Sequence, residues 1–191
     1  MSTIKKKGVR NLKKSAQVLT KGFTLVELLV VIAIIAILAA VVVLIINPLE
    51  LTRRGRDAAR LSDLANLQQA INVAVQEATG SATDILCVGG TVPCPGSSNG
   101  GGRASNGTGW VKVNMSAQKS VSVPTLPVDQ LNTTANHYTY CSDGVGWEIN
   151  TALESQQQSG KAGADGGDDP ALYEVGSDLT LIRTPGGSCT Y

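Results

Sequence analysis

The sequence predicts an α+β fold, in which a long N-terminal helix packs against a small antiparallel β-sheet head. An apolar run from Phe23 to Ile46 contains a single charged residue, Glu27. A helical stripe of apolar residues continues to residue 78, and the rest of the chain is rich in glycine and in short alternating segments. The 191 residues leave room for one ordinary domain plus extensions.

The first half of the predicted helix is long enough to cross a membrane. Its 24 residues, 23–46, would form a helix about 36 Å long, which exceeds a hydrocarbon core of ~30 Å. A core helix of a soluble domain needs only one apolar face. A cleaved secretory signal has a shorter apolar run that ends in small residues. We therefore interpret this run as a transmembrane helix.

Charge is distributed unevenly along the chain. Residues 1–22 hold seven basic residues and no acid, which leaves nine basic and fifteen acidic residues in the remainder. A basic flank stays in the cytoplasm, so we expect residues from about 50 onward to lie outside. The acidic remainder argues against nucleic-acid binding. The sequence shows no recognisable set of a nucleophile and a base, so nothing in it indicates an enzyme.

Glu27 is the anomaly of the apolar run. A carboxylate within a membrane span costs roughly 2.5–3.5 kcal/mol on insertion scales, which makes it a candidate functional residue. The alternative is that its side chain reaches the lipid headgroups, because it lies only four residues into the run.

The residues around Glu27 resemble the processing signal of type IV prepilins and pseudopilins. The sequence KGFTLVE at 21–27 joins a basic leader, a glycine, a phenylalanine and an acid four residues after it. In that family a prepilin peptidase cuts after the glycine and methylates the new N-terminal phenylalanine. The resemblance implies cleavage between Gly22 and Phe23, removal of leader 1–22, and an N-methylated Phe23.

The same resemblance implies a function. The chain would be a structural subunit of a type IV pilus or of a type II secretion-like pseudopilus, in which the Phe23 amine meets Glu27 of a neighbouring subunit. The implied partners are other pilin subunits in a filament, the prepilin peptidase, membrane lipid and an assembly platform. The protein would begin as a single-pass inner-membrane protein and end in an extracellular or periplasmic filament.

Two alternatives stay open at this point. One is a pilin-like minor subunit whose head binds a surface or DNA. The other is a membrane-anchored extracytoplasmic enzyme or binding domain that keeps its N-terminal helix unprocessed.

Behind the span we predict an amphipathic continuation of the helix over 48–80. Pro48 predicts a kink or local melting, or a plain helix end, and we expect one helix from about Thr24 to Thr79. Its apolar stripe would pack beneath the head; the stripe consists of Leu61, Leu64, Leu67, Ile71, Ala74, Val75 and Ala78.

Four arginines follow the span, at positions 53, 54, 56 and 60. We expect them on a solvated helix face, where an Asp57–Arg60 pair adds little. Arg53 and Arg54 are also candidates for contacts with lipid phosphates before extraction from the membrane, and then with acidic patches on adjacent subunits.

The head should cover residues 81–191, with loops over 81–109, a glycine-rich loop over 96–109 and a C-terminal loop over 155–191. The turn Ser142-Asp143-Gly144 predicts a hairpin. We expect a sheet of three to five strands drawn from residues 110–115, 121–123, 138–141, 145–151 and 179–183.

All four cysteines fall in the head, and no C-x-x-C spacing favours zinc. Four thiols allow three pairings, and an even number outside the membrane favours oxidation. We favour Cys87–Cys94, which closes a small loop, and Cys141–Cys189, which resembles the C-terminal disulfide loop of many type IV pilins.

Three carboxylates crowd into the segment 161–172, at Asp165, Asp168 and Asp169. Oxygen ligands in a flexible loop suit Ca²⁺, and major pseudopilins of type II secretion have a calcium site in a comparable loop. A solvated acidic turn is the alternative. No other cofactor is indicated.

Overall fold

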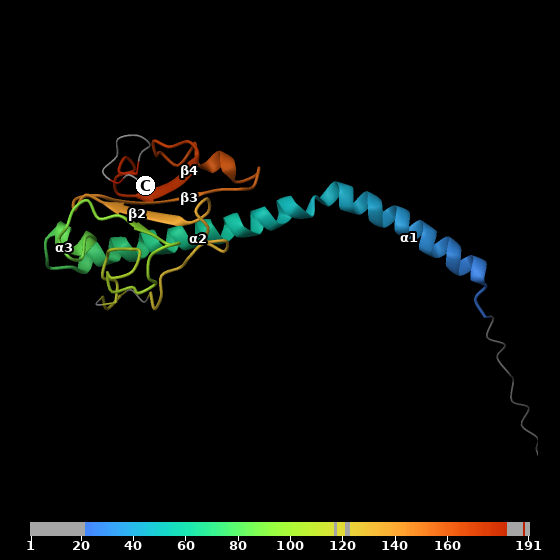
Figure 1. Cartoon of the computed structure of the whole chain (residues 1–191), viewed down its shortest axis with the longest axis horizontal. Coiled ribbons are helices and arrows are strands. Elements are labelled where there is room, and N and C mark those ends of the chain that lie inside the picture. The colour runs from blue at the N-terminus through green and yellow to red at the C-terminus, as the bar shows by residue number, and fades with distance from the viewer. Residues whose placement is uncertain (1–21, 117, 121–122, 183–188, 190–191) are drawn as a thin grey trace, which may run out of the picture. The chain divides into compact units, whose positions relative to one another are not determined.

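The protein is described from a computed structural model, in which residues 22–116, 118–120, 123–182 and 189 are described. The chain forms two compact units that meet in sequence between Ile45 and Ile46. Most of the predicted leader (1–21) and positions 121–122 of one predicted strand lie outside the described residues. Figure 1 shows the elements.

Helix α1 (Leu25–Ile46) makes up most of the described part of the first unit. Its described side chains are all exposed, although nearly all of them are apolar. Within the described part of the chain, one helix is long and apolar enough to cross a membrane, and it is this one, over Leu25–Val43. The predicted apolar N-terminal helix is confirmed.

A break at Asn47 separates α1 from α2 (Pro48–Glu77). Asn47 has φ 44° and ψ 79°, a left-handed conformation that asparagine tolerates. Its side chain accepts a hydrogen bond from the Glu50 N–H at 3.3 Å, and Pro48 takes the first helical position, where a missing N–H costs nothing. The expected single helix is therefore two helices, because a left-handed residue ends the i→i−4 ladder.

The second unit contains one antiparallel sheet in the order β1-β2-β3-β4. The strands are β1 (Gly96–Ser97), β2 (Tyr138–Ser142), β3 (Trp147–Ala152) and β4 (Leu172–Gly176). The predicted hairpin joins β2 to β3: the Asp143 carboxylate accepts the Val145 and Gly146 N–H groups, and Gly144 has φ 86°. The α+β class with a small antiparallel sheet is confirmed.

Both faces of the sheet are covered. One face packs against the apolar stripe of α2, so that Tyr140 and Ile149 meet Leu64, Leu67 and Ile71 in the main core, and α2 runs along this face in Figure 1. On the other face, Cys141 packs in a smaller cluster, which also contains Leu181, Ile182 and Cys189. The two layers leave β2 entirely buried.

The predicted strand at 110–115 is wrong. Its alternating apolar residues are buried, but among the described residues the segment makes one isolated bridge, between Asn106 and Asn114, and no ladder. The backbone is held by irregular bonds such as Trp110 N–H to Gly102 C=O at 2.8 Å. A side chain at Gly109 would collide with the Ala104 carbonyl, so the chain turns here at very short range. The alternation of apolar residues correctly predicted which side chains are buried, but it wrongly predicted that the backbone pairs with a neighbouring strand.

Three other boundaries also differ. Residues 179–182 form turns and bends where a strand was expected. Strand β4 instead lies in the stretch that was expected to be the C-terminal loop. The short 3-10 helix η1 (Ser159–Lys161) precedes β4 in that stretch. A short helix, α3 (Ala82–Leu86), and strand β1 lie in the stretch 81–109, which was expected to be loop.

Candidate processing and assembly site

The predicted cleavage point lies in extended chain before the first helix. Gly22, Phe23 and Thr24 are not helical, and α1 begins at Leu25. Phe23 is 84% exposed. Apart from the chain neighbours, no described residue has an atom within 4 Å of the position that a Cβ on Gly22 would occupy. The described residues therefore leave room for a side chain here, and a requirement for glycine would come from a molecule that binds this segment.

Glu27 and Thr24 form a reciprocal cap at the start of α1. The Glu27 Oε2 atom accepts hydrogen bonds from the Thr24 N–H at 2.9 Å and from the Thr24 hydroxyl at 2.7 Å. The Glu27 N–H donates to the Thr24 hydroxyl at 3.2 Å. This is a capping box, in which two N–H groups with no helical partner are satisfied by side chains.

The cap gives the Glu27 carboxylate a partner within its own chain. Both donors come from one residue, three positions earlier, so the interaction exists in the isolated subunit. A carboxylate held by hydrogen bonds is less costly to remove from water than a bare one. Sequence reasoning overlooked Thr24, although T-x-x-E directly before an apolar run is the pattern of a capping box.

A cluster of buried charges anchors α2 to the head. Arg60 is 1% exposed, and its guanidinium contacts Asp129 at 2.5 Å, Asp57 at 3.0 Å and Glu154 at 2.9 Å. It also donates to the Ala152 carbonyl at 3.1 Å. The expected solvated face is wrong for Asp57 and Arg60, because loops far along the chain bring two further carboxylates over them.

The carboxylates of α2 also hold the segment after β3. Asp57 accepts the N–H groups of Glu154 and Ser155, the latter at 2.7 Å, and Glu50 accepts the Gln156 N–H at 2.9 Å. Burial alone would raise the pKa of Asp57, but these hydrogen bonds and the Arg60 charge hold that pKa below its ordinary value.

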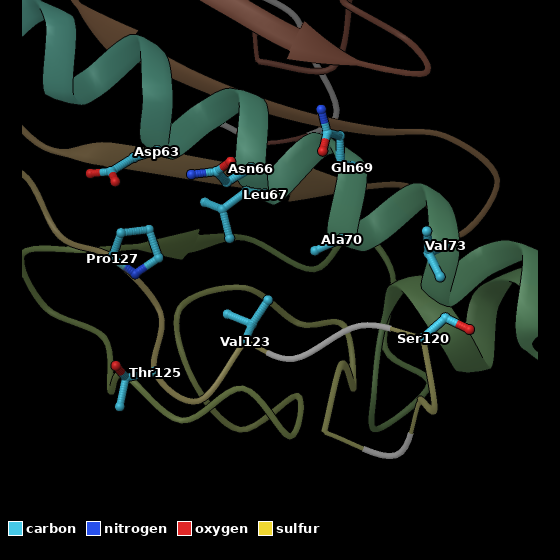
Figure 2. Close-up of a pocket in the computed structure, with 10 residues that line it drawn as sticks. All are labelled: Asp63, Asn66, Leu67, Gln69, Ala70, Val73, Ser120, Val123, Thr125 and Pro127. Atoms are coloured by element: carbon cyan, nitrogen blue, oxygen red, sulfur yellow. The ribbon is translucent and has the colours of Figure 1, made fainter.

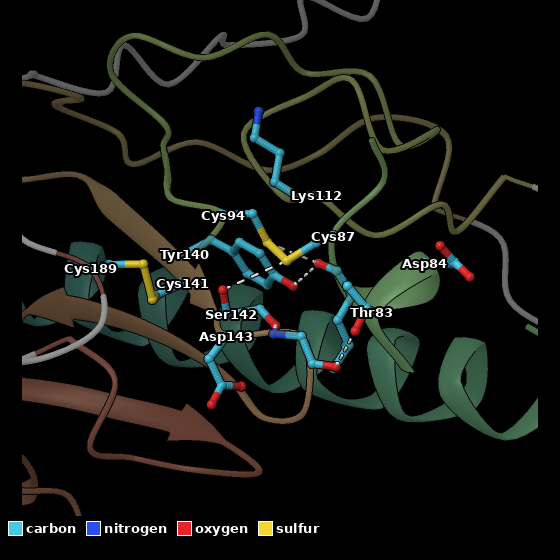
Figure 3. Close-up of a disulfide and its surroundings, with 12 residues drawn as sticks. Thr83, Asp84, Cys87, Cys94, Lys112, Tyr140, Cys141, Ser142, Asp143 and Cys189 are labelled. Carbon is cyan, nitrogen blue, oxygen red and sulfur yellow. Dashed lines mark hydrogen bonds between the residues drawn. A yellow bond between two sulfur atoms is a disulfide. The ribbon is translucent and has the colours of Figure 1, made fainter. Parts of the chain in front are cut away.

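The structure contains the two favoured disulfides. Cys87 is bonded to Cys94, and Cys141 to Cys189. Figure 3 shows the first beside Tyr140, whose hydroxyl donates to the Leu86 carbonyl at 2.7 Å. The second links β2 to the C-terminal segment, and the Cys189 N–H also donates to the Leu181 carbonyl at 3.1 Å.

The acidic loop does not gather its carboxylates into a ligand set. Asp165 accepts the N–H groups of Gly167 and Glu174, and Asp169 accepts the Ala171 N–H. Among the described residues, no group of three or more His, Cys, Asp or Glu side chains could hold a metal ion. Calcium binding by Asp165, Asp168 and Asp169 stays a prediction, to be tested by melting the protein with and without Ca²⁺.

Sequence reasoning also missed two buried glutamates on the outer face of the sheet. Glu148 on β3 accepts the N–H groups of Leu181 and Ile182, both at 2.9 Å, and Glu174 on β4 accepts the Asp169 N–H. Burial, together with the neighbouring Glu174, raises the pKa of Glu148 to about 8. Glu148 thus holds the segment that follows β4, and Glu174 holds the segment that precedes it, through backbone hydrogen bonds.

Comparison with known proteins defines the class of the N-terminal segment. Residues 19–43 match a family model described as the prokaryotic N-terminal methylation motif, which is the prepilin-type cleavage and methylation signal of type IV pilins and pseudopilins. Searches of curated proteins and of solved structures found no significant match.

The matched segment contains the cleavage point, the capping box and most of α1. The match shows that this segment carries a prepilin-type processing signal, the kind of segment on which the prepilin peptidase acts, and the rest of the chain lies outside the matched residues. The apolar helix and the motif together indicate a single-pass, membrane-anchored protein. Proteins with this motif are structural subunits that assemble into filaments.

Proposed function

We propose that this protein is a structural subunit of a type IV pilus or a type II secretion-like pseudopilus. In this proposal the prepilin peptidase cuts between Gly22 and Phe23 at the cytoplasmic face and methylates Phe23. The head lies outside the membrane, and the mature subunit leaves the bilayer for an extracellular or periplasmic filament, with the help of an assembly platform.

The observation that carries the proposal is the unpartnered surface of α1. Its described apolar side chains are exposed on every side, so no described residue of the first unit buries them. Lipid can cover this surface before assembly, and the same helix of neighbouring subunits can cover it afterwards. The prepilin-type processing signal at the start of this helix supports the proposal.

Glu27 has a defined part in this exchange. Cleavage creates a cationic amine on Phe23, four residues before Glu27. In a packed helical core, an amine without a counter-charge is strongly penalised. We therefore infer that Glu27 exchanges its Thr24 donors for the Phe23 amine of a neighbouring subunit, which fixes the register of the filament.

Processing is tested by mass spectrometry of the protein from its native host. The mature chain should begin at Phe23 and carry one extra methyl group. A mature protein that retains residues 1–22 would falsify the processing step.

Assembly is tested by measuring cleavage and filament yield together. Glu27→Ala should be inserted and cleaved normally, because the glycine is the main demand of the peptidase, yet it should fail to assemble. Glu27→Asp should be intermediate, and Glu77→Ala, which removes a carboxylate at the far end of α2, serves as the matched control. Normal filaments from cleaved Glu27→Ala would leave the carboxylate with no role in register.

A further inference from the structure

A groove of about 490 Å³ runs along one flank of α2. Figure 2 shows α2 as one wall, which presents Asp63, Asn66 and Val73, and the segment that carries Val123 and Pro127 as the other. The groove is open, with apolar side chains along its middle and a carboxylate, Asp63, at one end.

Asp63 differs from the other acids of α2 that lie near the head. Asp57 and Glu50 each receive an arginine and a backbone N–H group. Asp63 accepts a hydrogen bond from the Tyr138 hydroxyl at 2.9 Å, and among the described residues it forms no ion pair. Burial raises the pKa of Asp63, and the charge of Asp129 adds to this despite the Tyr138 bond. Within the described part of the chain, the groove thus ends in a carboxylate with no compensating cation.

Arg53 is the matching exception among the cations of α2. Arg54, Arg56 and Arg60 all form ion pairs within the chain. Arg53 is half-buried and has no ion pair with any described residue. Ten residues separate Arg53 from Asp63, which is about 15 Å along a helix, so the two cannot pair within one straight α2.

We propose that the groove is an intersubunit docking site, in which Arg53 of a second copy of this chain pairs with Asp63. The inference rests on the proposed filament. The aliphatic part of an arginine side chain can lie over the apolar middle of the groove while its guanidinium reaches the carboxylate. Parallel packing of two α2 helices through this contact sets their axial offset on the order of 15 Å.

Charge exchange in the full-length protein tests the pair. Arg53→Glu and Asp63→Arg should each lower the recovered filament by on the order of fivefold, as for a partly exposed ion pair that meets a like charge. The double variant should return the yield to within about twofold of the parent, because it restores the pair in reverse. Lys161→Glu, with the same change of charge on a residue outside the groove, should leave the yield unchanged.

Two milder variants guard against misfolding. Arg53→Gln and Asp63→Asn remove the charges with little change of shape, and the amide oxygen in the second variant can still accept a hydrogen bond from the Tyr138 hydroxyl. Their losses should be equal and should not add in the double variant. Formation of the Cys141–Cys189 disulfide reports that the head has folded.

The other outcomes of these experiments would contradict the proposed Arg53–Asp63 contact. Normal filaments from both single variants, or fully additive losses, overturn the pairing and leave the proposed function standing. A parent protein that is cleaved but forms no filament overturns both.

Discussion

Helices α1 and α2 follow one another in the chain, yet they satisfy opposite demands. α1 has apolar side chains exposed on all sides and one carboxylate, which its own Thr24 caps. α2 is rich in charge, and its buried face includes the ion pairs of Arg60 as well as an apolar stripe. The difference shows that the buried face of α2 finds its partners within the second unit, whereas the apolar surface of α1 is not covered within the first unit.

The strongest test of this contrast is the removal of the Arg60 guanidinium. Arg60→Met should destabilise the head by about 3–5 kcal/mol, because Asp57 and Asp129 would be left buried without a counter-charge. For a unit of this size the melting temperature should fall by roughly 10 °C. Thermal unfolding of the full-length protein in detergent measures this.

Arg54→Met is the matched control. Its side chain is 46% exposed and pairs with Glu50 one turn away, so its loss should cost at most about 1 kcal/mol. Equal melting temperatures for the two variants would show that the Arg60 cluster is no anchor.

The disulfides offer the next largest effect. Cys141–Cys189 spans 48 residues and Cys87–Cys94 spans 7. By the chain-entropy model, replacing each pair with serines should cost about 4 kcal/mol for the first and about 2.5 kcal/mol for the second. Thermal melts of both double variants compare them, and a larger loss for Cys87–Cys94 would contradict the model.

Acid should weaken the head through the same cluster. The pKa values of Asp57 and Asp129 lie below the ordinary 3.8, since hydrogen bonds and Arg60 outweigh the burial that would raise them. Their stabilisation is thus present above the unfolded-state pKa and is lost as pH falls through the folded values. Melting curves from pH 6 to pH 2 should show this loss, and Asp129→Asn should reduce it.

Glu148 has the opposite effect on the pH dependence of stability. Its raised pKa, about 8, gives the opposite sign: its contribution is complete below the ordinary 4.5 and declines as pH rises toward 8. A head whose stability does not fall below pH 4 would contradict the role given to the two aspartates.

The smallest effect concerns the cap of α1. Thr24→Val should destabilise the first turn of α1 by about 1 kcal/mol. The substitution removes the hydroxyl that donates to the Glu27 carboxylate and accepts the Glu27 N–H. Thr24→Ser keeps the hydroxyl and should match the parent. Circular dichroism and amide exchange in detergent micelles measure both, and equal fraying in the valine and serine variants would dismiss the cap.

What the sequence could predict was local. The apolar character of α1 and the turn at Asp143-Gly144 depend on neighbouring residues, and both predictions were confirmed. The burial of Arg60 could not be predicted, because its partner Asp129 is 69 residues away. The segment 110–115 failed for a related reason: alternation marks buried positions, but pairing depends on close approaches such as the one at Gly109.

Asn47 has a mechanical consequence. Its left-handed backbone ends one hydrogen-bond ladder, and its side chain starts the next by accepting the Glu50 N–H. Tension applied to α1 is therefore transmitted to α2 through a single pair of covalent torsions, not through a shared helix. A pulling force can therefore unwind α1 turn by turn. The unwinding should stop at residue 47, because the ion pairs and disulfides of the head resist the force independently of α1.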